Sequence, residues 1–239
     1  MRCPTLQKSP RIAFGRGRCG KAEWDKLSNH LQLQGWAPVP LPRSSNLRDG
    51  MLSIAQALGV VVSSQPNSPI EIVSPHSLNG ARPSSLSKVY GLSAFPLHTD
   101  TAHWTVPCRY VILGCAQIGR VDTPTVLVDA NDPSFSADER LLLRSSTFSI
   151  KNGGNSFYGS LIDGQRRFTR FDPGCMFPVT ESSRTAIHLY SMKRQSERVI
   201  TYRWNEENVL IIDNWRMLHG RGNKTQADPL RRLLRVYVQ

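Results

Sequence analysis

Apolar residues recur at helical spacing in the early part of the chain and again near its middle. The pattern predicts three helices, over residues 22–34, 47–58 and 136–144. Gly35 and Gly59 end the first two, because glycine readily adopts the backbone conformations that follow a helix. Asn46 and Ser136 are residue types that cap a helix N-terminus, and Glu139 can complete a capping box with Ser136.

Short apolar and β-branched runs, separated by turn residues, predict strands over the rest of the chain. The expected strands lie at residues 36–41, 70–73, 109–116, 125–129, 209–212 and 231–238, with further short strands and turns between 147 and 177. Residues 63–69 are expected to be turn-rich and 74–87 to be loop, whereas 187–202 fits either a helix or a strand. Helices followed by many short strands indicate a mainly β barrel or sandwich with helical cover.

Length and composition narrow the class of protein. A chain of 239 residues with 39% hydrophobic residues can bury a substantial core. We expect one domain over residues 21–239, after a basic N-terminal arm at residues 1–20. No apolar run approaches the roughly 20 residues that span a bilayer, and the basic start lacks the apolar core of a signal peptide. We therefore expect a cytoplasmic protein without a membrane partner.

The net charge of +12 raises nucleic-acid binding as one possible function. Part of this charge comes from basic residues in the first 21 positions, where no acidic residue balances them: Arg2, Lys8, Arg11, Arg16, Arg18 and Lys21. The arm lacks the series of interleaved aromatic residues that a base-stacking platform requires, so we expect a solvated leader and no nucleic-acid partner. The same basic balance favours an anionic substrate.

Five cysteines are present, an odd number without C-x-x-C spacing. This pattern argues against both a disulfide framework and a structural zinc site.

The most informative chemistry lies in residues 95–104, which contain a histidine and an aspartate separated by one residue. On an extended backbone, side chains two positions apart point to the same face, so His98 and Asp100 can converge on one point. His219, which precedes Gly220 and Arg221, is a third possible ligand. Two histidines and one carboxylate on one side of a metal are typical of non-haem Fe(II) oxygenases, although the same groups also bind Zn(II).

Taken together, several stretches resemble the taurine dioxygenase and clavaminate synthase-like superfamily of Fe(II)/2-oxoglutarate-dependent oxygenases. These stretches are residues 24–59, 95–104, 107–129, 170–173, 209–221 and 231–238. The resemblance implies a double-stranded β-helix, or jelly-roll barrel, with iron at its mouth. It also implies Fe(II), 2-oxoglutarate and O2 as cofactor and cosubstrates, and release of succinate and CO2 as a small molecule is hydroxylated, desaturated or cyclised.

By this resemblance, His98, Asp100 and His219 are the iron ligands and catalytic residues. Retention of Asp100 argues against the related halogenases, which replace this carboxylate with a small residue. A non-catalytic metal- or ligand-binding barrel remains an alternative.

Cosubstrate binding is assigned in the same way. Arg231 matches the arginine that holds the distal carboxylate of 2-oxoglutarate, since a planar guanidinium grips a carboxylate with two hydrogen bonds. Thr125 matches the threonine beside it, with Thr123 as a competing assignment. A strand shifted by one residue would exchange Arg231 with Arg232.

Substrate contacts are expected from Arg235, His103, Trp104 and Arg170. Arg235 shares a strand face with Arg231, so it should face an anionic substrate or the iron-bound end of the cosubstrate. The alternative is an internal salt bridge to an acid such as Asp213. We expect a small, anionic or amino-acid-like substrate. Other members of the superfamily carry a polar substrate contact where this chain has Ala94-Phe95. Their substrate contacts therefore cannot be assigned to this chain.

Overall fold

The structure is a computed structural model that describes residues 21–41, 46–64, 68–80, 86–130, 135–165, 168–195, 199–206, 208–222 and 226–239. The expected basic arm at residues 1–20 lies outside these ranges, as does part of the expected turn at residues 63–69.

Five α-helices and one 3₁₀ helix are found in the described residues. They are α1 (Lys21–Gln34), α2 (Leu47–Leu58), η1 (Leu78–Gly80), α3 (Ser87–Tyr90), α4 (Ala137–Ser145) and α5 (Glu181–Gln195).

Twelve strands are found in the same residues. They are β1 (Trp36–Pro40), β2 (Val61–Val62), β3 (Glu71–Val73), β4 (Tyr110–Gln117), β5 (Thr125–Asp129), β6 (Phe148–Asn152), β7 (Asn155–Gly159), β8 (Met176–Pro178), β9 (Ile200–Tyr202), β10 (Asn208–Asp213), β11 (Met217–Arg221) and β12 (Arg232–Val238).

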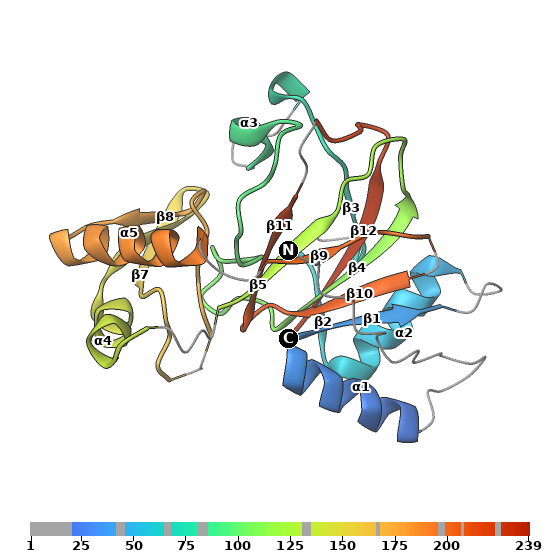
Figure 1. Ribbon diagram of the computed structural model, residues 1–239, viewed down its shortest axis with the longest axis horizontal. Coiled ribbons are helices and arrows are strands. Elements are labelled where there is room, and N and C mark those ends of the chain that lie inside the picture. Colours follow the sequence, from blue (N-terminus) through green and yellow to red (C-terminus); the bar gives the residue numbers. More distant parts are fainter. Residues whose placement is uncertain are drawn as a thin grey trace, which may run out of the picture.

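The strands form three antiparallel sheets (Figure 1). The largest has six strands in the order β1-β10-β4-β12-β2, with β3 also paired to β12. A second sheet has the order β11-β5-β9, and a third has the order β7-β6-β8. The third sheet lies to one side in Figure 1 with α4 and α5.

Alternating side chains explain the unbroken apolar runs of the central strands. On β10, Val209 and Ile211 belong to the core cluster shared with α1 and α2, whereas Leu210 and Ile212 belong to the cluster shared with β5, β9 and β11. Helices therefore cover one face of the six-stranded sheet, and the β11-β5-β9 sheet covers the other. α2 approaches β4 so closely that a Cβ on Gly114 would lie 2.5 Å from the Met51 sulfur.

The β7-β6-β8 sheet, α4 and α5 share a separate hydrophobic core with residues Leu97 and Ala102, which lie after α3. Phe135 stacks on Tyr190 with ring centroids 5.8 Å apart. The same cluster includes Ala102, Phe171 and Leu218, which lie beside the predicted ligand residues. This core therefore fixes the neighbourhood of the candidate site from one side.

Most predicted elements are confirmed. The first helix starts one residue early, and Asn46 and Ser136 cap α2 and α4, the latter through the expected capping box with Glu139. The ambiguous residues 187–202 contain both the end of α5 and strand β9. Three elements were not predicted, namely β2, β11 and α3, and the expected loop at 74–87 contains η1. No helix in the described part of the chain is both long and apolar enough to cross a bilayer.

Candidate metal and cosubstrate site

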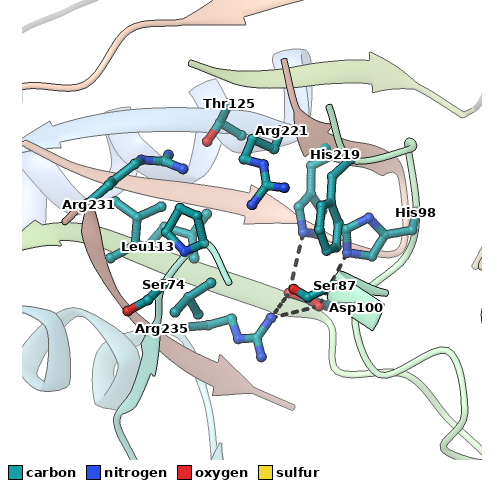
Figure 2. A pocket seen from close by; sticks show the side chains of 15 residues that line it. Ser74, Ser87, His98, Asp100, Leu113, Thr125, His219, Arg221, Arg231 and Arg235 are labelled. Carbon is teal, nitrogen blue, oxygen red and sulfur yellow. Dashed lines mark hydrogen bonds and ion pairs between the residues drawn. The ribbon is translucent and has the colours of Figure 1, made fainter. Parts of the chain in front are cut away.

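A pocket opens between the six-stranded sheet and the β11-β5-β9 sheet (Figure 2). It brings together six of the residues singled out from the sequence: His98, Asp100, Thr125, His219, Arg231 and Arg235. Residues distant in the chain meet here because β12, β11 and β5 border the same cavity.

Backbone pairing holds the two histidines together. The amide of His98 donates to the carbonyl of His219 at 2.9 Å, and the amide of His219 donates back at 3.1 Å. Their ring centroids are 4.7 Å apart. Gly220 permits this close approach, because a Cβ there would lie 2.7 Å from the carbonyl oxygen of Phe95.

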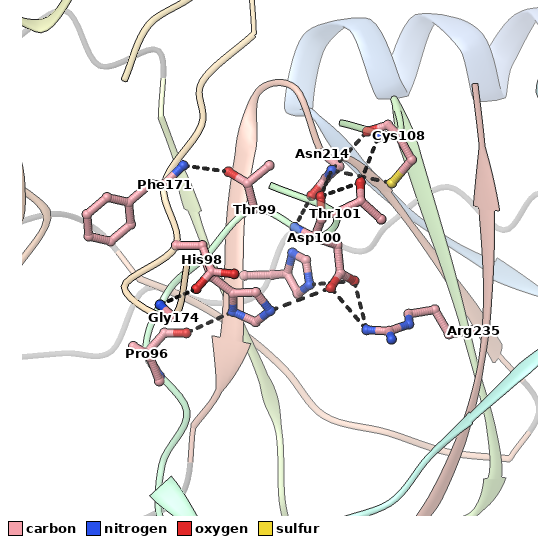
Figure 3. Close-up of polar contacts among 12 residues, drawn as sticks. Pro96, His98, Thr99, Asp100, Thr101, Cys108, Phe171, Gly174, Asn214 and Arg235 are labelled. Atoms are coloured by element: carbon pink, nitrogen blue, oxygen red, sulfur yellow. Dashed lines mark hydrogen bonds and ion pairs between the residues drawn. The ribbon is translucent and has the colours of Figure 1, made fainter. Parts of the chain in front are cut away.

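Asp100 lies in a turn, held by Asn214 from the end of β10 (Figure 3). The Asp100 amide donates to Asn214 Oδ1 at 2.9 Å, and Asn214 Nδ2 donates to the Asp100 carbonyl at 3.0 Å and to the Cys108 carbonyl at 2.9 Å. Thr101 turns the chain with φ of 54°, and its hydroxyl donates to the Asp100 carbonyl at 2.7 Å. These bonds aim the Asp100 carboxylate at the histidines.

The three side chains converge as a metal site requires. One ligand atom from each of His98, Asp100 and His219 lies within 4.8 Å of the other two, and all three residues are buried. His98 Nε2 lies 3.7 Å from one Asp100 oxygen, and His219 Nε2 lies 3.3 Å from the other. His98 Nδ1 donates to the Pro96 carbonyl at 3.0 Å, which leaves the Nε2 lone pair facing the cluster. The donor set therefore fits a divalent metal ion.

Charge on these groups follows from burial and from their mutual contacts. Burial opposes the ionised form of Asp100, but the positive charge of Arg235 and hydrogen bonds from both histidines hold its pKa well below the usual range. Burial lowers the pKa of His219. For His98, burial acts in the same direction, but the hydrogen bond and charge of Asp100 outweigh it and raise the pKa. The cluster thus presents an ionised carboxylate, as a metal ligand must be.

Arg231 lies at another part of the pocket, just before β12, and only 6% of it is exposed. No hydrogen bond or ion pair of its guanidinium is found among the described residues, and burial lowers its pKa to about 10. Thr125 lines the same pocket, and its hydroxyl accepts a bond from Trp204 Nε1 at 3.0 Å. The competing Thr123 donates to the Val121 carbonyl and does not line the pocket. A buried, unpaired guanidinium beside a hydroxyl is suited to a carboxylate ligand.

Arg235 has internal acidic partners. Its Nη1 lies 3.0 Å from Asp100 Oδ1, and its Nη2 lies 2.7 Å from Glu71 Oε2. The alternative of an internal salt bridge is therefore found, but Asp213 was the wrong acid to name. Glu71 is the directly opposed residue on β3, which sequence spacing alone could not reveal.

The other expected substrate contacts lie outside this pocket. The guanidinium of Arg170 donates to the backbone carbonyls of Ala102, Trp104 and Thr105, the last at 2.9 Å. Trp104 packs edge-on against Tyr237 with centroids 5.9 Å apart, and His103 packs against Trp104. Arg170 thus shapes the loop that follows Asp100, and its contact with a substrate stays a prediction.

Arg221 and Glu71 were not selected as site residues from the sequence. Arg221 lines the pocket, two positions after His219 on β11. Side chains two apart on a strand share a face, so recognising β11 as a strand would have identified Arg221. Glu71 gave no comparable signal, because an acid on a short strand is ordinarily solvated.

Comparisons with known proteins agree with this geometry. Residues 149–237 match the family model described as taurine catabolism dioxygenase TauD, TfdA family. The structure resembles an asparagine oxygenase solved with Fe(II), 2S,3S-3-hydroxyasparagine and succinate, with TM-score 0.72 and 18% identity over 91% of this chain and 82% of the other. It also resembles the non-heme iron oxygenase OrfP solved with Fe and alpha-ketoglutaric acid, with TM-score 0.68 and 19% identity over 92% and 80% of the two chains. The sequence matches no curated protein.

The expected fold is confirmed: the sheets are those of a TauD-like double-stranded β-helix. The buried His98, Asp100 and His219 cluster fits the iron site that the resemblance implied. Residues 149–237 thus match the TauD, TfdA family model, and the chain has the fold of solved oxygenases that bind Fe(II) and alpha-ketoglutarate.

Proposed function

We propose that this protein hydroxylates a small amino-acid-like carboxylate and converts 2-oxoglutarate and O2 to succinate and CO2. One observation supports this proposal most strongly. A buried two-histidine, one-carboxylate cluster and the unpaired guanidinium of Arg231 border the same pocket. A metal-binding barrel without catalysis would have no need for a separate buried cation placed to receive an acid.

In this proposal, three side chains bind the iron and two other residues hold those ligands in place. His98, Asp100 and His219 hold iron from one side, which leaves positions on the metal for cosubstrate and O2. Bound iron would supply the oxidation, in which one oxygen atom of O2 enters succinate and the other enters a C–H bond of the substrate. Asn214 keeps Asp100 in place, and the Pro96 carbonyl keeps the His98 ring oriented.

Arg231 and Thr125 bind the distal carboxylate of 2-oxoglutarate. The guanidinium offers two parallel donors, and Thr125 adds a directed hydroxyl. Since Arg231 is buried, an incoming carboxylate would replace the missing counter-charge, and binding is favoured on that account. Arg232 is half exposed and donates to the Pro229 carbonyl, so we assign it no role in binding.

An amino-acid-like substrate is supported by the asparagine oxygenase structure, which holds 2S,3S-3-hydroxyasparagine, and by a structure of an OrfP mutant in complex with (3S)-hydroxy-L-Arg. We propose that Arg235, His103, Trp104 and Arg170 shape the substrate side of the site. Arg235 does so while paired to Asp100 and Glu71, so a substrate carboxylate would share a guanidinium that already has partners. We further propose that residues 21–239 act as one domain in the cytoplasm, with the basic arm dispensable.

The experiment is a succinate-release assay of the full chain with Fe(II), 2-oxoglutarate and a panel of L-amino acids and small dicarboxylates. His219→Ala is the matched control, because it removes one ligand. A substrate should raise succinate release well above the substrate-free rate, and mass spectrometry should find a product 16 Da heavier, the mass of one oxygen atom. Absence of succinate with every compound, in protein shown to bind Fe(II) and 2-oxoglutarate, would instead favour the non-catalytic barrel.

A further inference from the structure

Arg221 is a charged pocket residue whose partners are all neutral. Its Nε donates to the Ser93 carbonyl at 3.1 Å, and its Nη2 donates to the Gly91 and Ser93 carbonyls at 2.5 and 2.6 Å. The guanidinium lies over the Phe95 ring, 4.5 Å from its centroid. Among the described residues, no acid pairs with it and no hydrogen bond of Nη1 is found.

The strand register places Arg221 beside the proposed cosubstrate residues. Arg221 is directly opposite Thr125 in the β11–β5 pair, so their side chains share a face. It also shares a face with His219, two positions earlier. Figure 2 shows the Arg221 guanidinium pointing into the pocket, in the region between Arg231 and His219.

Within the described ranges, two cations therefore face one cavity with no acidic partner. Burial, and then the charge of Arg231, lowers the pKa of Arg221 to about 10. Burial likewise lowers the pKa of Arg231 to about 10. The nearby acids are already engaged, since Asp100 and Glu71 both contact Arg235. Arg231 is buried and Arg221 is half-buried, and like charges held partly out of water are costly unless an anion joins them.

We propose that Arg221 is a second guanidinium for the distal carboxylate of 2-oxoglutarate, binding it together with Arg231 and Thr125. This inference rests on the proposed function and adds a specificity-determining residue to it. The free Nη1 is the donor that the carboxylate would take, while Nε and Nη2 keep their bonds to Gly91 and Ser93. The Phe95 ring and the bonds to Gly91 and Ser93 already hold the guanidinium in place, so little further ordering is needed on binding.

A structural role must be distinguished from this binding role. Through Gly91 and Ser93, Arg221 also fastens the segment that leads into His98. Loss of Arg221 would then weaken the binding of any 2-oxo acid to the metal, whether or not that acid has a distal carboxylate. A pair of ligands separates the two roles: 2-oxoglutarate, and 2-oxopentanoate, which has a methyl group in place of the distal carboxylate.

The experiment is anaerobic calorimetry of the Fe(II)-loaded full chain with both 2-oxo acids. In Arg221→Gln, 2-oxoglutarate should bind about 10- to 100-fold more weakly, as expected for loss of a hydrogen bond to a charged group. Binding of 2-oxopentanoate, measured by competition where it is weak, should change less than about twofold. Arg221→Lys, which keeps the charge, should recover part of the loss. Arg184→Gln, at an exposed pair on α5, is the matched control.

Three results would overturn the inference. Equal weakening of both acids would show that Arg221 acts only through the segment before His98. Unchanged binding of both would remove Arg221 from the cosubstrate site. Failure of the wild-type chain to bind 2-oxoglutarate at all would refute the proposed function itself, whereas normal wild-type binding with either of the first two results refutes this inference alone.

Discussion

His98 and His219 are partners in an isolated antiparallel β-bridge, and each donates its backbone amide to the other's carbonyl. The relative position of the two imidazoles therefore depends on main-chain hydrogen bonds as well as on side-chain packing. This pairing restricts the movement of the two ligands independently of any bound metal. Preorganisation of this kind lowers the entropic cost of binding.

Asn214 should be needed both for stability and for metal affinity. In Asn214→Ala, the Asp100 amide and the Cys108 carbonyl lose their buried partner. Each buried group left unpaired costs about 1–3 kcal/mol, so we expect the free energy of unfolding to fall by about 3 kcal/mol. Urea denaturation measures this change, with the exposed Asn152→Ala as control. Equal stability of the two variants would contradict the role assigned to Asn214.

Arg231→Ala should weaken 2-oxoglutarate binding far more than Arg232→Ala. Loss of a buried, charge-assisted contact costs about 2–5 kcal/mol, whereas an exposed charge contributes less than about 1 kcal/mol. Anaerobic titration of 2-oxoglutarate into each Fe(II)-loaded variant gives the comparison. A larger effect of Arg232→Ala would mean that Arg232, and not Arg231, binds the distal carboxylate of 2-oxoglutarate.

Arg170→Lys should destabilise the protein more than it changes substrate affinity. Lysine lacks the planar fork by which the Arg170 guanidinium serves three carbonyls, so buried or part-buried carbonyls would be left unpaired. We expect a loss of about 1–3 kcal/mol in the free energy of unfolding. If stability is instead unchanged and the Michaelis constant for the substrate rises, Arg170 is a substrate contact as the sequence suggested.

Arg235→Gln should make the metal-free protein less stable and increase its stabilisation by Fe(II). The substitution leaves the buried Asp100 and Glu71 carboxylates without their shared cation, which costs about 3–5 kcal/mol for a broken buried pair. Iron would then replace the missing positive charge at Asp100. Thermal unfolding with and without Fe(II), under nitrogen, should show a larger metal-induced rise in Tm for Arg235→Gln than for wild type. An equal rise in both would contradict this account.

The parts of the site that the sequence could predict are those governed by local rules. Helix caps at Asn46 and Ser136 and the alternation along β12 depend on neighbouring residues alone. The alternation correctly placed Arg231 and Arg235 on the pocket side. The prediction that His98 and Asp100 converge was also correct. The extended backbone that it assumed is only partly present, because His98 lies in the β-bridge and Asp100 lies in the turn that follows it.

What the sequence could not show depends on contacts between distant segments. The pairing of Arg235 with Glu71 arises because β3 adds to the edge of β12. Strand β11 is short and contains Gly220, a residue type that is depleted in strands. Its conformation therefore depends on pairing with β5, which local sequence does not show. Arg221 was missed for the same reason.

The assignment of the metal and cosubstrate site is tested most directly by anaerobic absorption spectroscopy. Addition of Fe(II) and then 2-oxoglutarate to the purified full chain should produce a weak visible metal-to-ligand charge-transfer band. His98→Ala, Asp100→Ala and His219→Ala should each abolish the band, while circular dichroism shows that each variant remains folded. A band of full strength in any one of these folded variants would remove that residue from the ligand set, and no band in the wild type would contradict the assignment of the site as a whole.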